Sequence, residues 1–280
     1  MARDGAGIYD EGANITVTTK TTTKSAAATD QTILAKLKAM GFSDEYVESP
    51  RRLIVSLEGK TGTGKTDFAL RHTPDPIIYL DVDVGTEGVV GKFQDMGKQI
   101  LIYPVRVPRE ASKDVWSQMW ADFKVRIRKV YGLNSGTVVW DTASELYELC
   151  RLSHFGRLTE VKPSDYAVVN NEWREVLRIA YDAQNLNTIF VHKVKAVWRM
   201  QASSSGRSSL SKTDDFELMG FSEMEYMTQV NLVMSCRYED GEPVFSAAVK
   251  KCRHNPNIVG TLLEGPMCNF EILLGMVHGK

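Results

Sequence analysis

A glycine-rich octapeptide, GKTGTGKT, has residue types and spacing suited to holding a chain of phosphates. It matches the pattern G-x-x-x-x-G-K-[ST], with an apolar segment typical of a strand before it and a helical pattern after it. Its glycines let backbone N–H groups face phosphate oxygens where a Cβ would collide, and the helix start adds partial positive charge. Lys65 would place an ammonium against the β- and γ-phosphates, and Thr66 would offer a hydroxyl to Mg²⁺. The motif predicts a site for a nucleoside triphosphate with Mg²⁺, formed by Gly59, Lys60, Thr61, Gly62, Thr63, Gly64, Lys65 and Thr66.

Carboxylates that end apolar segments are the candidates for the rest of this chemistry. Asp141 closes the segment TVVWD, and we expect it to support Mg²⁺ together with Thr66. The water-activating base is not beside it, because Thr142 follows. Another segment ends in Asp81-Val82-Asp83, with Glu87 four residues further on, and an acid there could deprotonate the attacking water. We favour Asp83, with Glu87 and Asp81 as alternatives.

His192 ends the apolar segment TIFVH. In parallel sheets that follow a phosphate loop, this strand commonly lies between the loop strand and the strand that ends in the metal-supporting acid. That position predicts His192 as a sensor of the γ-phosphate, with a structural histidine as the alternative.

These residues need a sheet to position them. Apolar, strand-like segments occupy residues 53–58, 77–83, 99–105, 137–141 and 188–192. Helical spacing separates several of them, most clearly at residues 112–131 and 165–183. Near-continuous apolar strands between helices predict an α/β fold with a mainly parallel sheet covered on both faces. Residues 231–251, around Asp240-Gly241, predict an antiparallel hairpin at the sheet edge.

The remaining segments divide the chain. Residues 1–28 contain a Thr/Ala/Lys tract without apolar periodicity, which predicts a disordered arm, and residues 29–50 predict a short helical lead-in. Residues 51–280 form the predicted nucleotide-binding domain. Within it, residues 193–216 predict a mobile basic loop.

Composition excludes several classes of protein. The 280 residues carry 34 Lys and Arg against 35 Asp and Glu, a net charge of −1, which argues against coating duplex DNA by bulk charge. The four cysteines are too widely spaced for a zinc or redox motif, which indicates reduced thiols. The sequence shows no signal-like start and no apolar run long enough to span a membrane, so we expect a cytoplasmic protein, in the host if viral, without a membrane partner.

With the phosphate loop, Asp83, Asp141, His192 and the terminal hairpin in this order, the chain resembles the RecA-like ATPase core over about residues 50–265. More narrowly, it resembles phage-encoded "AAA domain" proteins related to single-domain recombinase and strand-annealing ATPases. In RecA-like proteins the acid after the second strand is normally Glu, so Asp83 puts the rate of hydrolysis in doubt more than nucleotide binding. Many relatives carry Gln where His192 stands.

The resemblance implies two further sites. Related oligomeric ATPases project a Lys-x-Arg pair into the neighbour's nucleotide, and Lys251-Cys252-Arg253 resembles that pair; a solvated strand end is the alternative. Recombinases carry a DNA-binding loop after the sensor strand, and here residues 193–212 hold five cations, one tryptophan and no acid. The residues that would contact single-stranded nucleic acid are Lys193, Lys195, Trp198, Arg199, Arg207 and Lys212. A disordered surface loop is the alternative.

The resemblance therefore implies an ATPase that uses ATP and Mg²⁺ and acts on single-stranded DNA in phage recombination, annealing or replication. It implies a homo-oligomer, as a ring or filament, and a single-strand-binding protein as a further partner. Two other functions remain open: a kinase for a small molecule or nucleotide, which needs an acceptor pocket, and an NTP-gated scaffold or loader with little hydrolysis.

Overall fold

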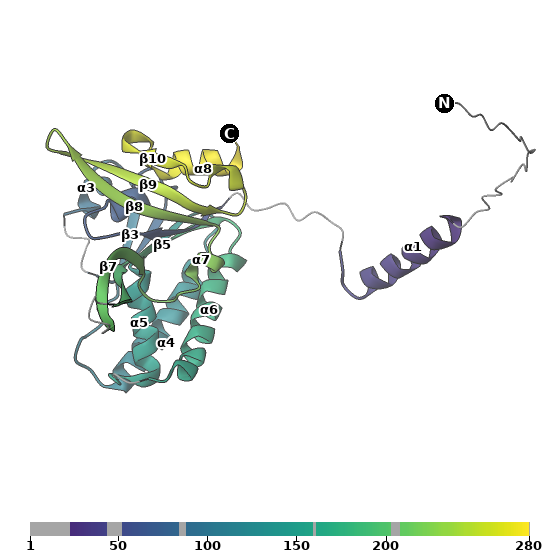
Figure 1. Ribbon diagram of the computed structural model, residues 1–280, viewed down its shortest axis with the longest axis horizontal. Helices are drawn as coiled ribbons and strands as arrows, with labels where there is room; N and C mark the ends of the chain where they lie inside the picture. Colours follow the sequence, from purple (N-terminus) through teal and green to yellow (C-terminus); the bar gives the residue numbers. More distant parts are fainter. Residues whose placement is uncertain (1–22, 44–51, 84–87, 159–160, 203–207, 280) are drawn as a thin grey trace, which may run out of the picture. The chain divides into compact units, whose positions relative to one another are not determined.

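The computed structural model describes residues 23–43, 52–83, 88–158, 161–202 and 208–279. The chain divides into two units, Met1–Ser49 and Pro50–Lys280. In the first unit, α1 spans Thr23–Ala39 (Figure 1). The helix begins earlier than the sequence predicts, inside the segment assigned to a disordered arm, because the alanines at 26–28 have the highest helix propensity and extend it. The rest of that arm, residues 1–22, lies outside the described residues.

The second unit is built on a sheet that, within the described residues, has eight strands in the order β10-β9-β8-β1-β5-β4-β2-β3. All pairings from β8 to β3 are parallel, whereas β9 pairs antiparallel with β8 and with β10. The strands are β1 (Ile54–Glu58), β2 (Ile77–Asp81), β3 (Ile100–Pro104), β4 (Gly136–Asp141), β5 (Leu186–His192), β8 (Val230–Glu239), β9 (Glu242–Cys252) and β10 (Leu262–Glu264).

Helices cover both faces of this sheet, as the apolar strands predict (Figure 1). Successive residues of β1 belong to opposite cores, with Val55 in one and Ile54 in the other. The Val55 core includes side chains of α2 (Lys65–Leu70), α3 (Val90–Asp95) and α8 (Phe270–His278). The Ile54 core includes side chains of α4 (Lys113–Val130), α5 (Ala143–Phe155), α6 (Tyr166–Asp182) and α7 (Met224–Met227). Short 3₁₀ turns occupy Pro163–Asp165, Pro256–Ile258 and Gly265–Met267.

The Ile54 core depends on aromatic packing between α4, α6 and β4. Trp120 stacks on Trp173 with ring centroids 6.0 Å apart, and Trp140 meets Trp173 edge-on at 5.9 Å. All three side chains are almost fully buried. This packing fixes β4, and therefore the position of Asp141 at its end.

Strand β5 lies between β1 and β4, which confirms its predicted place. In register, His192 pairs with Glu58 of β1, while Asp141 of β4 pairs with Val191 of β5 and with Asp81 of β2. The carboxyl ends of four strands therefore meet at one edge, where parallel sheets place their ligands.

Two antiparallel hairpins follow. The sequence predicts a loop at the first, but β6 (Val194–Ala202) pairs with β7 (Ser208–Leu218). The Ser-rich stretch continues into β7, which begins at Ser208, and residues 203–207 lie outside the described part. The second, β8–β9, confirms the predicted hairpin: Asp240 and Gly241 have φ of 51° and 86°, as a turn with two left-handed positions requires.

The sequence also predicts reduced cysteines and no segment that spans a membrane. The four cysteines are free thiols in the structure. Among the described helices, none combines the length and apolarity that crossing a membrane demands.

Candidate nucleotide site

The segment between β1 and α2 forms a tight loop that only glycine permits at two positions. A Cβ on Gly59 would lie 2.6 Å from the Met234 carbonyl oxygen and 2.8 Å from Thr63 Oγ1. Gly64 has φ of +80°, and a Cβ there would lie 2.6 Å from the ring of Phe245 on β9. The loop is thus closed from one side by the second hairpin.

Lys65 turns its side chain back over this loop. Its Nζ donates hydrogen bonds to the carbonyl oxygens of Gly59, at 2.8 Å, and Lys60, at 2.7 Å. Burial lowers the pKa of Lys65, and the nearby Asp141 carboxylate partly offsets that effect. The partly desolvated ammonium at the loop is well placed to contact a phosphate oxygen.

Thr66 and Asp141 meet, although 75 positions separate them in the sequence. Thr66 Oγ1 donates to Asp141 Oδ2 at 2.7 Å, and the Tyr79 hydroxyl of β2 donates to the same oxygen at 2.6 Å. Burial raises the pKa of Asp141, while the Tyr79 and Thr66 hydrogen bonds and the Lys65 charge lower it. Ionising this buried carboxylate is costly without a cation beside it. The hydroxyl and the carboxylate together offer oxygen ligands, which Mg²⁺ prefers.

The structure separates the two described candidates for the base, Asp83 and Asp81. Asp83 lines the cavity around the phosphate loop, and its carboxylate lies 2.9 Å from Lys193 Nζ. Asp81 is buried, does not line that cavity and has Oδ2 2.6 Å from Arg106 Nη2. Glu87 lies outside the described residues. Asp83 is therefore the described candidate in reach of a bound nucleotide.

His192 occupies its predicted place at the end of β5, but its ring faces the interior. The side chain is almost fully buried, and neither ring nitrogen has a hydrogen-bond partner among the described residues. Burial lowers the pKa of His192 to about 3, so the ring is neutral. It does not line the cavity, whereas the next residue, Lys193, does. This placement does not support a direct contact between His192 and a γ-phosphate.

Lys193, which the resemblance assigns to nucleic acid, belongs to the nucleotide cavity. Its Nζ lies 2.7 Å from Glu145 Oε1 in the first turn of α5, in addition to Asp83. These ion pairs raise its pKa against the effect of burial. Sequence alone missed Glu145 and Tyr79, because neither belongs to a local motif.

The base of the β6–β7 hairpin forms one wall of this cavity, whose volume is about 820 Å³. Val194, Phe216 and Met219 line it together with the phosphate loop. Lys60 Nζ lies 3.9 Å from the centroid of the Phe216 ring, a cation–π contact between loop and hairpin. The nucleotide-binding loop and the hairpin are thus in direct physical contact.

Further along the hairpin, acids of β7 neutralise the predicted basic surface. Lys195 Nζ lies 3.2 Å from Glu217 and Arg199 Nη2 lies 2.8 Å from Asp215. Lys212 is exposed and has no ion pair with a described residue, and Arg207 falls outside the described residues. Trp198 is 59% exposed, so the indole is accessible for stacking while the charge is largely balanced.

Lys251 and Arg253, the predicted trans-acting pair, do not line this chain's own phosphate-loop cavity. Lys251 Nζ donates to the carbonyl oxygen of Thr228 at 2.8 Å, and both side chains donate to the carbonyl oxygen of Tyr226. A trans role therefore stays a prediction, and it requires these bonds to α7 and its end to open.

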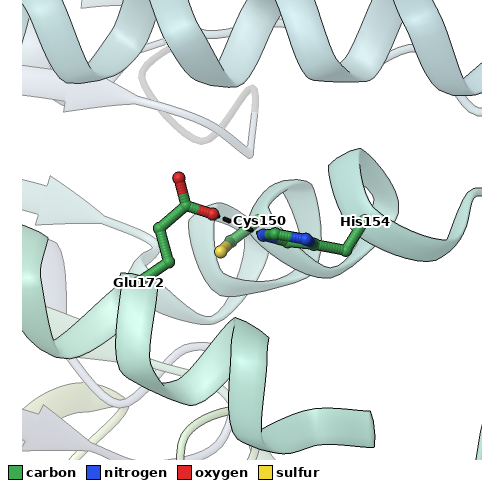
Figure 2. Close-up of side chains that lie close together, drawn as sticks. All are labelled: Cys150, His154 and Glu172. Atoms are coloured by element: carbon green, nitrogen blue, oxygen red, sulfur yellow. Dashed lines mark hydrogen bonds and ion pairs between the residues drawn. The ribbon is translucent and has the colours of Figure 1, made fainter.

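A second group of polar side chains lies between α5 and α6, away from the phosphate loop. Figure 2 shows Cys150, His154 and Glu172, whose ligand atoms lie within 4.8 Å of one another. Zinc uses these ligand types. However, the Glu172 carboxylate is already paired with His154 and with Lys124 of α4, and burial raises the pKa of the Cys150 thiol. The cluster is accounted for as an ion-pair network that joins three helices.

Comparison with known proteins gives similar solved structures and a matching family. Two similar solved structures are a KaiC-like protein, PH0186, from Pyrococcus horikoshii OT3 (15% identity, covering 72% of this chain and 79% of that one, TM-score 0.39) and the flagellar accessory protein FlaH from Methanocaldococcus jannaschii (12% identity, covering 77% and 85%, TM-score 0.40). No curated protein matches the sequence. The family described as an AAA domain matches residues 51–254, from just before β1 to just after β9. Since that match spans well over half of the chain and contains the phosphate loop, this protein belongs to the AAA domain family.

Proposed function

We propose that the protein binds ATP with Mg²⁺ at the phosphate loop and hydrolyses it. The observation that carries this proposal is the hydrogen bond from Thr66 to Asp141, which joins the loop hydroxyl to a buried carboxylate from another strand. Mg²⁺ at this pair would neutralise charge on the β- and γ-phosphates. Lys65 would contact the same phosphates as a cation.

Asp83 would orient and deprotonate the attacking water. In the structure its carboxylate is paired with Lys193, so a water can take that place only when the ammonium moves to another anion. The γ-phosphate of a bound nucleotide is such an anion, because Asp83 and Lys193 line the same cavity as the loop. Nucleotide binding would therefore release the base.

The β6–β7 hairpin is the surface that we propose for single-stranded nucleic acid. Trp198 and Met200 are exposed, at 59% and 63%, and the base of the same hairpin lines the nucleotide cavity. Because Lys195 and Arg199 are paired with acids, stacking on Trp198 would supply most of the affinity. We therefore expect a weaker dependence on salt than a basic loop would give.

The proposal extends to assembly and process. A homo-oligomer would allow Lys251 and Arg253 to reach a neighbour's ATP, and single-stranded DNA in phage recombination, annealing or replication is the substrate that the resemblance implies. A single-strand-binding protein would then supply or compete for the same DNA.

One observation favours the second candidate, an NTP-gated scaffold with little hydrolysis. The acid after β2 is the shorter Asp83, and it is held by a cation. Nucleotide-dependent assembly with negligible phosphate release would support the scaffold over the hydrolase.

Phosphate release with and without an oligo(dT) strand tests the proposed function. Lys65→Ala should abolish turnover, because it removes the phosphate-binding ammonium. Trp198→Ala should keep basal turnover but lose most of the stimulation by DNA, whereas Tyr238→Ala, at a residue 75% exposed on β8, serves as the matched control. Absence of saturable, Mg²⁺-dependent binding of ATP or GTP by the wild-type protein would overturn the proposal.

A further inference from the structure

A second cavity lies directly beside the phosphate-loop cavity. Its volume is about 680 Å³, within the range of small-molecule sites. The two cavities share two described lining residues, Asp83 and Lys193. The Asp83–Lys193 ion pair is thus the boundary between them. We call the second space the arginine cavity, after Arg109, Arg151 and Arg157 in its lining.

The arginine cavity is placed where the fold places ligands. Within its lining, Arg157 and Leu158 follow α5 and Tyr166 begins α6. The rest of the lining comes from residues after β2, β3 and β5 and from α5, which follows β4. These are segments beyond the carboxyl ends of parallel strands, the usual position of ligand sites in α/β sheets. This part of the cavity adjoins the phosphate-loop cavity, with which it shares Asp83 and Lys193.

Its charges favour an anion. The described lining carries four cations and three carboxylates, and each carboxylate is already paired. Lys193 pairs with Asp83 and Glu145, and Arg151 holds Glu148 through two bonds, at 2.7 and 2.5 Å. Because these acids are neutralised, the charge of the remaining arginines determines which ligand the cavity attracts.

Those arginines are Arg109 and Arg157. Among the described residues Arg109 has no ion-pair partner, and Arg157 reaches only Glu110, at 4.0 Å on the exposed surface. Guanidinium groups bind phosphate with two parallel hydrogen bonds, so two of them in one cavity indicate a phosphorylated ligand.

The rest of the lining is apolar or aromatic. Leu152 is buried, Val107 and Pro108 are half-buried, and Tyr166 contributes a half-buried ring. An inorganic ion would leave this surface unused, whereas a nucleoside presents a flat base and a sugar to it.

We propose that the arginine cavity binds a nucleoside monophosphate unit, either free or as one residue of a nucleic acid strand. Arg109 and Arg157 would hold the phosphate, and Tyr166 and the apolar residues would contact the nucleoside. The site deepens the proposed function, since it names where a second phosphorylated ligand would lie relative to ATP, but its binding does not require hydrolysis.

Binding measurements with the full chain test this site. Isothermal titration of dTMP and fluorescence anisotropy of labelled oligo(dT) are carried out in saturating MgADP, so that the phosphate loop is filled. The double variant Arg109→Gln/Arg157→Gln is compared with wild type, and Arg128→Gln, at an exposed arginine of α4 outside the cavity, is the matched control. Thermal unfolding verifies that all variants fold.

The double variant should weaken binding by roughly ten-fold or more, because each lost guanidinium removes a charge-assisted contact. Loss for both probes would indicate a site open to free mononucleotide, and loss for oligo(dT) alone would indicate a strand. Unchanged affinity for both, or no binding by wild type, would overturn the proposal. If the protein failed to bind ATP, the dTMP and oligo(dT) measurements would still test the arginine cavity. Failure of the proposed function and failure of this site can therefore be told apart.

Discussion

Lys193 holds its Nζ 2.9 Å from an Asp83 carboxylate oxygen and 2.7 Å from Glu145 Oε1, at the boundary between the phosphate-loop cavity and the arginine cavity. Asp83 follows β2, Glu145 lies at the start of α5, and Lys193 follows β5. One ammonium thus connects the candidate base to both ligand spaces and occupies the carboxylate that an attacking water would have to reach.

The assignment of the base gives the first prediction. Asp83→Asn should lower kcat about 100-fold while KM for ATP changes little, because general-base contributions are typically of that size and the phosphate contacts remain. Steady-state phosphate release measures both constants. The comparison variant is Asp81→Asn, which breaks the ion pair between the buried Asp81 and the exposed Arg106 and should lower the unfolding temperature rather than kcat specifically. The reverse pattern would reassign the base to Asp81.

A second prediction concerns the pH dependence of activity. Tyr79→Phe removes a hydrogen bond that stabilises the ionised Asp141, so the pKa of Asp141 should rise further above its ordinary value. Mg²⁺ binding needs the carboxylate, so activity would be lost at a higher pH on the acid side. The midpoint of the acid limb of kcat should therefore move to higher pH.

Tyr147→Phe is the control for this shift. It removes a hydroxyl that donates to Asn170 at 2.7 Å, outside the phosphate-loop cavity, and should leave the midpoint in place. An unshifted midpoint in Tyr79→Phe would show that Asp141 does not govern the acid limb.

Much of the nucleotide site could be predicted because its parts are local patterns. The phosphate loop is continuous in sequence, and Asp141 ends a strand that apolar residues mark clearly. The place of β5 between β1 and β4 could also be expected, because that order is common in parallel sheets that follow a phosphate loop. What sequence could not supply is side-chain direction: His192 has the predicted place, yet its ring is buried while Lys193 lines the cavity.

The hairpin shows a different limit. Counting charges over residues 193–212 predicts a basic loop, but the acids that pair with Lys195 and Arg199 lie just beyond that window. Antiparallel pairing places Glu217 opposite Lys195, while Arg199, which lies opposite Ser211, reaches along the hairpin to Asp215. A charge count along the chain cannot foresee neutralisation that depends on strand register.

A third prediction tests the closure of the phosphate loop by β9. Gly64→Ala would force a Cβ to within 2.6 Å of the Phe245 ring at φ of +80°, so the loop must shift. We expect at least about ten-fold weaker nucleotide binding in titration of a fluorescent ATP analogue. Gly91→Ala is the matched control, because this helical glycine has open space where a Cβ would stand and the variant should bind normally. Equal affinities in both variants would contradict the close contact.

The buried His192 gives a prediction about stability rather than catalysis. Its pKa of about 3 in the folded protein lies below the ordinary value of 6.5, so the unfolded chain takes up a proton that the folded chain excludes. The stability is fully present above pH 6.5 and is lost as the pH falls toward 3, at up to about 1.4 kcal/mol per pH unit.

His192→Leu removes the titrating ring and should therefore flatten the fall in unfolding free energy between pH 7 and pH 5, by roughly 2 kcal/mol. Urea denaturation at each pH measures the free energy of unfolding. Taking the difference between the two pH values cancels the effect of any change in packing. His72→Leu, at a side chain 49% exposed, controls for loss of a histidine at the surface. If His192→Leu keeps the wild-type slope, the ring takes up its proton equally in the folded and the unfolded protein, and His192 would again be a candidate to contact phosphate.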